Sequence, residues 1–306
     1  MASYLITGGA GFIGSTLAST LIARGHRVRV LDDLSTGHRA RVPEGAELVV
    51  GDIADGTMVA EMMEGVDGCF HLAAIASVAR CTEEWEASHR TNLSGTITVF
   101  HAAARAGVPV AYASSAAVYG HGAAAVLSET TPTAPRSAYG ADKLGCELHA
   151  RAAGIVHGLR SIGLRFFNVY GPGQDPSSAY AGVISRFLDA AAAGRAIIIE
   201  GDGGQTRDFV HVDDIVTGLI AALATADCEA PVLNLCTGQP TSIRALAALC
   251  AAAYDRPLVT TNRPPRAGDI RHSCGDATQA FRRCGWHAER TLGPSLRHMA
   301  ELAQPA

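Results

Sequence analysis

A glycine-rich loop near the N-terminus constrains the fold of this chain more than any other feature. The run Thr7-Gly8-Gly9-Ala10-Gly11-Phe12-Ile13-Gly14 follows an apolar, strand-like segment and opens a helix-like one. Its glycines allow a tight turn and a close approach of the backbone to a pyrophosphate, and the first N–H groups of the helix can bind that anion. The loop therefore predicts a dinucleotide site with contacts from Gly8, Gly11, Phe12, Ile13 and Gly14.

The first half of the chain alternates strand-like and helix-like segments. We expect strands at Tyr4–Thr7, Val28–Leu31, Glu47–Val50, Gly68–Leu72, Pro109–Ser114 and Ser161–Phe167. We expect helices near Phe12–Ala23, Thr57–Met63, Glu83–Ala106 and Ser137–His157. Such alternation is typical of an α/β fold with a doubly wound parallel sheet of the Rossmann type.

The pattern changes after Tyr170. A loop rich in Gly, Pro and Ser comes first, then a short strand at Ala196–Glu200, a helix at Val212–Thr225 and a strand at Val232–Cys236 that could rejoin the main sheet. Helical segments follow from about 242 to 254 and near the C-terminus. We therefore expect a dinucleotide-binding domain at 1–170, rejoined by about 205–238, and a smaller α/β substrate-binding lobe at 171–204 and 239–306.

Composition narrows the function classes. The chain has 306 residues, 48% of them hydrophobic, and a formal net charge of −4 without any basic block, which favours a soluble protein for small molecules over a nucleic-acid binder. Its start has no basic signal-peptide region, and no apolar run has membrane-spanning length, so a cytoplasmic location is expected. The eight cysteines form no C-x-x-C pair and the histidines lack ligand spacing, so free thiols and no metal are expected.

Two acids follow the second expected strand. Asp32 stands about 20 residues after the glycine loop, where a carboxylate can accept hydrogen bonds from the adenosine ribose hydroxyls. Asp33 beside it would repel a 2′-phosphate. The pair therefore favours NAD over NADP, although Arg39 and Arg41 are close by in the sequence.

A second group of residues carries catalytic chemistry. Ser114 and Ser115 end an expected strand, and Tyr139 and Lys143 lie one turn apart on the following helix. A free phenol ionises at about pH 10, so a tyrosine that acts as a base near neutrality needs a positive charge beside it. Lys143 supplies that charge, and a nicotinamide cation would add to it. It is the single lysine among 25 basic residues, which argues against its being there by chance.

With these residues the chain resembles the extended short-chain dehydrogenase/reductase family, and within it the branch of UDP-galactose and UDP-N-acetylglucosamine 4-epimerases. The resemblance covers nearly the whole chain and is carried by Thr7–Gly14, Gly51–Ile53, His71–Ala74, Asn92, Ser114–Gly120, Tyr139–Lys143, Arg165–Pro172, Thr206–Asp214 and Arg266–Asp269. It implies bound NAD, a UDP-sugar substrate and a homodimer joined through the helices around Glu83–Ala106 and Ser137–His157.

The resemblance also implies a role for each matching residue. The catalytic residues are then Ser115, Tyr139 as the base, and Lys143 as its partner. The implied cofactor contacts, beyond the loop and the two acids, are Asp52, Ile53, Leu72, Ala73, Ala74, Asn92, Ser114, Tyr139 and Lys143. The implied substrate contacts are Ser115, Asn168, Arg207, Arg266 and Asp269, and two arginine forks suit a diphosphate. One departure is that Ile75–Val78 contains no lysine, where branch members often place one against the cofactor.

The residues after the catalytic serine separate the candidate reactions. Family dehydratases carry an acidic pair there and decarboxylases a glutamate, whereas this chain has Ala116 and Ala117. The resemblance therefore implies a 4-epimerase that passes through a transient 4-keto sugar on UDP-glucose or UDP-galactose. Ser273 is small at a position that limits the sugar pocket, so N-acetyl sugars are expected to fit as well.

Three alternatives stay open at this point. A UDP-glucuronate 4-epimerase would need a cation for the sugar carboxylate, for which Arg186 is a candidate. Another nucleotide-sugar oxidoreductase, such as a 4-ketoreductase, would consume its nicotinamide cofactor. A non-catalytic NAD-binding protein could keep the same fold, because fold alone does not establish activity.

Overall fold

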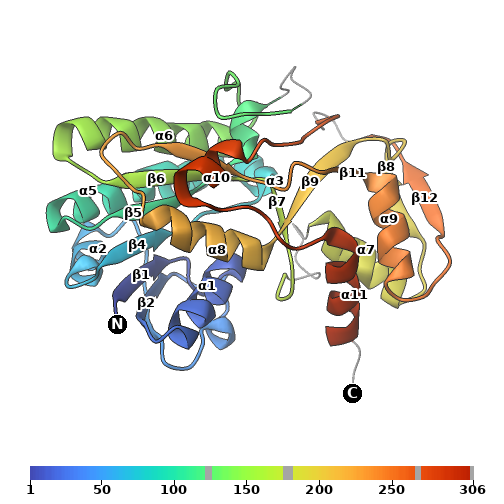
Figure 1. The fold of residues 1–306 in the computed structure, drawn as a ribbon, viewed down its shortest axis with the longest axis horizontal. Coiled ribbons are helices and arrows are strands. Elements are labelled where there is room, and N and C mark those ends of the chain that lie inside the picture. Colours follow the sequence, from blue (N-terminus) through green and yellow to red (C-terminus); the bar gives the residue numbers. More distant parts are fainter. Residues whose placement is uncertain (121–125, 175–181, 266–269, 304–306) are drawn as a thin grey trace.

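The computed structural model describes residues 1–120, 126–174, 182–265 and 270–303, which form a larger and a smaller body (Figure 1). The larger body holds the N-terminus and a central sheet, and the smaller one ends in the last helix. Within the described residues, no helix is long and apolar enough to cross a membrane.

The central sheet has seven strands, and every neighbouring pair in it is parallel. They are β1 (Ser3–Thr7), β2 (Arg27–Asp32), β3 (Glu47–Val50), β4 (Gly68–His71), β5 (Val110–Ser115), β6 (Ser161–Phe166) and β10 (Val232–Leu235). Their order across the sheet is β10-β6-β5-β4-β1-β2-β3, which confirms the predicted doubly wound sheet. The chain reverses its direction of travel between β1 and β4, and such a switch point opens a crevice at the carboxyl ends of the strands.

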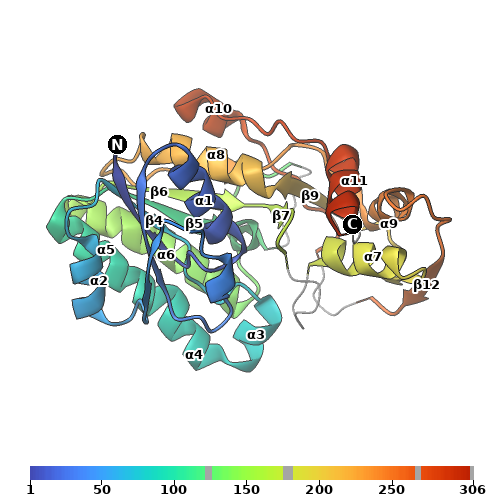
Figure 2. The same ribbon diagram turned by 90° about the horizontal axis from the view of Figure 1, so that it is seen from below.

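Helices cover both faces of this sheet (Figure 2). One face carries α1 (Phe12–Ala23), α8 (Val212–Leu223) and the short α10 (Thr278–Cys284), and the other carries α2 (Gly56–Met63), α5 (Thr96–Ala106) and α6 (Ala138–His157). Each layer has its own apolar core, with the α1 and α8 side chains in one core and the α2, α5 and α6 side chains in the other. Burial on both faces explains why the strands are almost continuously apolar.

The smaller body is built from two separate stretches of chain. Its helices are α7 (Val183–Ala192), α9 (Ile243–Ala252) and α11 (Leu292–Leu302), which share a third core with β8 (Ile197–Glu200). The exposed strand β12 (Thr260–Arg263) pairs with β8 in a two-stranded parallel sheet. A three-stranded sheet of β7 (Asn168–Tyr170), β9 (Thr206–His211) and β11 (Pro240–Ser242) lies between the two bodies. Because β7 follows β6 after a single residue, the second lobe starts where the catalytic sheet ends.

One segment departs from the boundary expected from the sequence. Residues 239–306 were all expected in the smaller lobe, yet α10 and Trp286 pack on the larger body, where Ala280 and Trp286 enter the α1/α8 core. The Trp286 indole donates to the Asp214 carbonyl at 2.8 Å. The C-terminal stretch therefore returns across the sheet before it forms α11.

The single helix expected at Glu83–Ala106 is interrupted. The chain instead forms α3 (Val78–Glu83), α4 (Trp85–His89), a π-helical turn at Arg90–Gly95 and then α5. Within that turn the Asn92 amide accepts from Ile75 N at 2.8 Å and donates to Ile75 O at 3.1 Å. Such π-turns are frequent at functional sites, and here the turn brings Asn92 to the loop that follows β4.

Candidate active site

Two adjoining cavities lie over the glycine loop, at the switch point of the sheet. The larger one, of about 430 Å³, extends over the ends of β5 and β6, and the smaller one, of about 80 Å³, extends toward β2. They share Gly8, Gly11, Thr36, Leu72 and Ala74. A dinucleotide is an elongated molecule, and two cavities that meet at a phosphate-binding loop match its two halves.

Two positions of the glycine loop admit only glycine, because neighbouring backbone atoms lie too close for a Cβ. Gly8 has φ +73°, and a Cβ there would lie 2.6 Å from Ala73 N. A Cβ on Gly14 would lie 2.2 Å from Gly8 O. The start of α1 is thus held against the turn, which leaves the first N–H groups of the helix facing the cavities.

Asp32 fixes this loop from the end of β2. Its carboxylate accepts from Ala10 N and from Leu34 N, each at 2.9 Å, and Asp32 and Asp33 both line the smaller cavity. The described lining of that cavity holds no Arg or Lys, so Arg39 and Arg41 do not reach it. Two carboxylates without a cation suit ribose hydroxyls and disfavour a 2′-phosphate.

The loop after β4 is held by a chain of buried hydrogen bonds. Thr7 Oγ1 lies 2.7 Å from His71 Nδ1, His71 Nε2 lies 2.9 Å from Thr96 Oγ1, and Thr96 Oγ1 donates to Asn92 O at 2.7 Å. Because the Thr96 hydroxyl proton goes to that carbonyl, Thr96 must accept from His71, which assigns the proton of the neutral ring to Nε2. Thr7 then donates to Nδ1 and accepts from Ala73 N at 3.3 Å.

Asn92 therefore acts below the cofactor loop. It is completely buried and lines neither cavity, whereas Leu72, Ala73 and Ala74 do. Asp52 and Ile53 line the smaller cavity as expected from the sequence. A direct Asn92 contact to the cofactor stays a prediction, and the described geometry gives Asn92 the task of shaping the Leu72–Ile75 backbone.

The two serines at the end of β5 differ in what their hydroxyls can do. Ser114 Oγ donates to Glu147 Oε1 at 2.5 Å, so its proton is committed and it can only accept from a ligand. Ser115 Oγ instead accepts from Ala117 N at 3.1 Å, which caps the 3₁₀ turn Ala116–Tyr119. That leaves the Ser115 proton available for a substrate oxygen, and both serines line the larger cavity.

Tyr139 and Lys143 reach the same cavity from the first turns of α6, whose N-cap Ser137 accepts from Gly140 N at 3.1 Å. Lys143 is 97% buried and donates to Ala113 O at 2.9 Å. Its Nζ lies 5.8 Å from the centre of the Tyr139 ring. The carbonyl thus fixes the ammonium beside the Tyr139 ring. The structure brings together all three catalytic residues that the sequence predicts.

Asn168 links this cavity to a third one in the smaller body. It lines both cavities, and its amide donates to Asp208 O at 3.1 Å. The third cavity, of about 670 Å³, contains four arginines among its lining residues, namely Arg186, Arg195, Arg207 and Arg263. Arg207 donates to Thr206 O and Ile270 O at 2.7 and 2.6 Å, so two backbone carbonyls hold its guanidinium in place.

Three predicted substrate residues are not placed in these cavities. Arg266 and Asp269 lie outside the described residues, so their roles remain predictions. Ser273 is buried and lines none of the three cavities in the described part of the chain. A limit on sugar size at Ser273 would thus have to act through the side chains that cover it.

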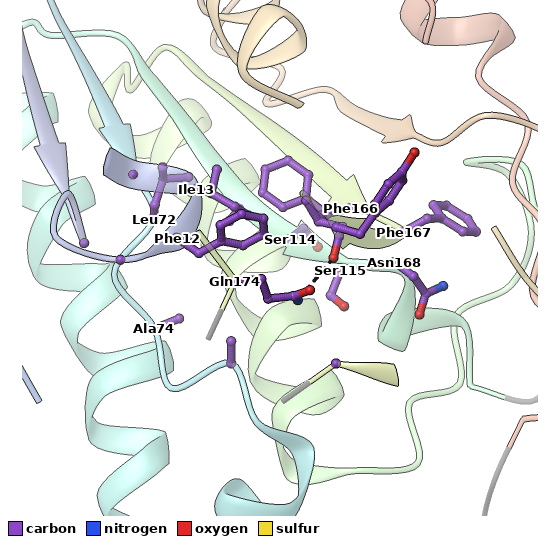
Figure 3. A pocket seen from close by; sticks show the side chains of 18 of the residues that line it. Phe12, Ile13, Leu72, Ala74, Ser114, Ser115, Phe166, Phe167, Asn168 and Gln174 are labelled. Atoms are coloured by element: carbon purple, nitrogen blue, oxygen red, sulfur yellow. Dashed lines mark hydrogen bonds between the residues drawn. The ribbon is translucent and has the colours of Figure 1, made fainter. Parts of the chain in front are cut away.

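The larger cavity also contains a residue, Gln174, that the sequence does not predict as part of the site. Figure 3 shows Phe12 and Ile13 on one side of the larger cavity, Phe166, Phe167 and Asn168 on the other, and Gln174 between them. The Gln174 amide oxygen accepts from Ser185 on α7 at 2.9 Å. Gln174 could be read from the sequence only as part of a loop, because that contact joins segments whose packing depends on the whole second lobe.

A parallel dinucleotide-type sheet with Ser, Tyr and Lys gathered at the carboxyl ends of its strands defines a nicotinamide-dependent oxidoreductase of the short-chain class. Comparison with known proteins narrows this class. The chain belongs to the NAD dependent epimerase/dehydratase family, whose model matches residues 4–236. Family membership makes NAD the cofactor, and the smaller cavity, whose described lining includes Asp32 and Asp33 and no Arg or Lys, fits its ribose.

Individual relatives point the same way. The chain is 38% identical to a UDP-glucose 4-epimerase of Mycolicibacterium smegmatis, over 97% of each chain. A UDP-glucose 4-epimerase of Thermotoga maritima, solved with UDP-glucose, is 34% identical with a TM-score of 0.92, over 98% of this chain and 97% of that one. A UDP-N-acetylglucosamine 4-epimerase of Methanobrevibacter ruminantium is 30% identical with a TM-score of 0.93 and the same coverage.

The buried imidazole of His71 makes stability depend on pH. Burial, and after it the charge of Lys143, lowers the pKa of His71 from 6.5 to about 3. Between these values the unfolded chain binds the proton and the folded protein does not, so the free energy of unfolding falls as the pH falls, by about 1 kcal/mol per pH unit. Chemical denaturation of wild type and His71→Gln should show a stability difference that shrinks between pH 6.5 and 4.

The exposed His287 provides the control, because His287→Gln removes a solvated imidazole. Its stability difference from wild type should stay small and constant with pH. A wild-type advantage over His71→Gln that is the same at pH 7 and pH 4 would contradict the neutral, buried ring.

Proposed function

We propose that this chain is an NAD-dependent UDP-hexose 4-epimerase that acts through a transient 4-keto sugar. The observation that carries the proposal is the chemistry of the larger cavity. Its described lining contains Ser115, Tyr139 and Lys143, but no Asp, Glu, His or Cys. One acid–base group suffices to oxidise and re-reduce a single carbon, whereas elimination of water or inversion at a second carbon needs further proton donors and acceptors.

The residues of the cavity then have distinct tasks. The Tyr139 phenolate takes the proton of the sugar 4-hydroxyl, and Lys143 stabilises the phenolate from its fixed place on the Ala113 carbonyl. Ser115 donates its free proton to the same sugar oxygen and orients it. Bound NAD supplies the acceptor, and then the donor, of the hydride. When the hydride has returned, Tyr139 gives the proton back.

Inversion requires the keto sugar to present its other face while the nucleotide stays bound. Half of the residues that line the larger cavity are Phe, Val, Ile or Gly, whose side chains form no hydrogen bond to a sugar, and the polar Asn168 and Gln174 are neutral. The neighbouring cavity supplies arginines for the diphosphate, with Arg207 among them and Arg266 expected there. A firmly bound diphosphate and a loosely held sugar together allow the sugar ring to rotate about the phosphate linkage.

The same lining favours neutral hexoses over uronic acids. Lys143 is the only cation in the described lining of the larger cavity, and it serves the base. Arg186 lines the adjoining cavity, on the side expected for the nucleotide. We therefore infer UDP-glucose and UDP-galactose as the primary substrates, with UDP-N-acetylglucosamine and its epimer next, and UDP-glucuronate last.

Incubation of the purified protein with each UDP-sugar, without added NADH, tests this proposal. We expect UDP-glucose to give UDP-galactose, quantified by anion-exchange chromatography or NMR, while the absorbance at the NADH wavelength shows no net increase. The same measurement on UDP-N-acetylglucosamine and UDP-glucuronate ranks the sugars. Stoichiometric consumption of a nicotinamide, or turnover of UDP-glucuronate alone, would overturn the proposal.

Removal of the phenol oxygen should abolish turnover without harming the fold. Tyr139→Phe is expected to lower kcat by a factor of about 10² to 10⁴, the usual contribution of a positioned acid–base group, with NAD still bound. Tyr254→Phe, which changes a tyrosine of the smaller body that lines none of the three cavities described above, should leave kcat unchanged. Full activity of Tyr139→Phe would show that another group removes the proton.

We further propose that two copies associate through α5 and α6. These helices lie side by side on the outside of the larger body (Figure 2). Ile97, Leu148, Ile155 and Val156 on them are 37–78% exposed, and exposed apolar side chains are typical of an interface.

Light scattering should give the mass of a dimer for wild type and a monomer for Ile155→Glu, with Leu258→Glu in the smaller body as control. A monomeric wild type would refute this.

A further inference from the structure

Two carboxylates stand close to Lys143 in the sequence of α6, one before it and one after it. Neither forms an ion pair with Lys143. Asp142 precedes it, and Glu147 follows one helical turn later. Residues four apart on a helix are the ordinary geometry for an ion pair. Among the described residues, however, no carboxylate lies within ion-pair distance of Lys143, whose ammonium donates to the Ala113 carbonyl instead.

Arg165 on β6 is the reason Glu147 does not pair with Lys143. Its Nε and one terminal nitrogen donate to the two carboxylate oxygens of Glu147 at 2.9 and 2.7 Å. Both side chains are 6% exposed. The other terminal nitrogen donates to the Tyr119 hydroxyl at 2.8 Å, and the guanidinium lies 4.7 Å from the centre of the Tyr119 ring. The planar fork is thus fixed from two sides, which a lysine could not reproduce.

The same carboxylate reaches the catalytic strand. Glu147 Oε1 accepts from Ser114 Oγ, so the Arg165–Glu147 pair ends at a residue that lines the larger cavity. Tyr119 continues the network, because its hydroxyl donates to the Asn234 side chain on β10 at 2.7 Å. The network therefore ties α6, which carries the base, to three neighbouring strands of the sheet.

We propose that Arg165 is a positioning residue for the catalytic base: it occupies both oxygens of Glu147 and so leaves the Lys143 charge for Tyr139. This inference rests on the proposed function only in taking Tyr139 as the base. In a buried site an uncompensated carboxylate one turn from Lys143 would attract the ammonium and oppose a second negative charge on the phenol. Arg165 cancels that charge without approaching the phenol itself.

The other titratable groups around Lys143 do not depend on Arg165. Asp142 accepts from His89 of α4 at 2.8 Å. His71 of β4 is held neutral by its low pKa, and burial raises the pKa of the Cys146 thiol on α6 and of the Cys81 thiol on α3. Burial raises the pKa values of Tyr112, Tyr119 and Glu129, and the Arg165 charge lowers them, but among the partners of Arg165 only Glu147 lies on α6 with Lys143.

Opposite charge changes in the pair should move the pH profile in opposite directions. In Arg165→Met the unpaired Glu147 carboxylate opposes the phenolate, so the acidic limb of kcat against pH should move up by about one pH unit. In Glu147→Gln the unpaired Arg165 favours the phenolate, so that limb should move down. The double variant, without either charge, should return close to wild type. Arg160→Met, which removes an exposed arginine on the same body, should not move it.

A titration of phenolate absorbance on the NAD-bound protein, taken as the difference from the matching Tyr139→Phe background, follows the same ionisation without any UDP-sugar. It thereby separates failure of this inference from failure of the proposed function. If Arg165→Met does not fold, the inference is tested with Arg165→Lys, which keeps the charge but not the planar fork, and with the uncharged double variant. For Arg165→Lys we expect an upward shift smaller than one pH unit.

A purely structural role gives a different result. Loss of stability would then lower kcat at every pH without moving the limb, in both single variants alike. Shifts in the same direction for Arg165→Met or Arg165→Lys and Glu147→Gln, or a double variant shifted as far as Arg165→Met, would overturn the inference. The thermal stability of each variant is measured in parallel. We expect the double variant to regain the wild-type pH profile of kcat without regaining wild-type thermal stability.

Discussion

The site depends on one buried ammonium. Lys143 is almost fully enclosed and donates to the Ala113 carbonyl, in the strand that presents both serines. Burial of an unpaired charge is costly, and in the proposed mechanism this charge has a task, because it stabilises the Tyr139 phenolate that takes the sugar proton. Three elements hold this arrangement in place. Strand β5 supplies the carbonyl, α6 supplies both side chains, and β6 supplies the guanidinium that pairs with Glu147.

The two bodies divide the work around that ammonium. The Asp32 carboxylate holds the glycine loop, and the His71–Thr96–Asn92 hydrogen bonds hold the loop after β4, so both walls of the proposed cofactor site are fixed. The smaller body brings four arginines to the adjoining cavity, where we propose that the diphosphate binds, and Asn168 lines both cavities. In the proposed mechanism the cofactor and the nucleotide stay bound, and only the sugar ring needs to move.

Much of this could be predicted from the sequence, because local signals specify it. The glycine loop, the buried strands and helix α1 were expected within about one residue of their observed bounds, since apolar runs bounded by Gly and polar residues are local patterns. The break of the helix at Arg90–Gly95 was not expected, because the π-turn is stabilised by an amide that pairs with Ile75 far away in the sequence. The three-residue strands β7 and β11 likewise exist only through their pairing with β9.

The same distinction applies to the site. The Tyr139 and Lys143 spacing is a pattern on one helix and is visible in the sequence, whereas the Glu147–Arg165 pair joins a helix to a strand and is not.

The most direct measurement of the central claim is the fate of a hydrogen isotope at carbon 4 of the sugar. With UDP-glucose deuterated there, the account predicts that UDP-galactose retains the deuterium at carbon 4. Exchange of that deuterium with solvent protons would contradict hydride transfer at this carbon and with it the role assigned to Tyr139.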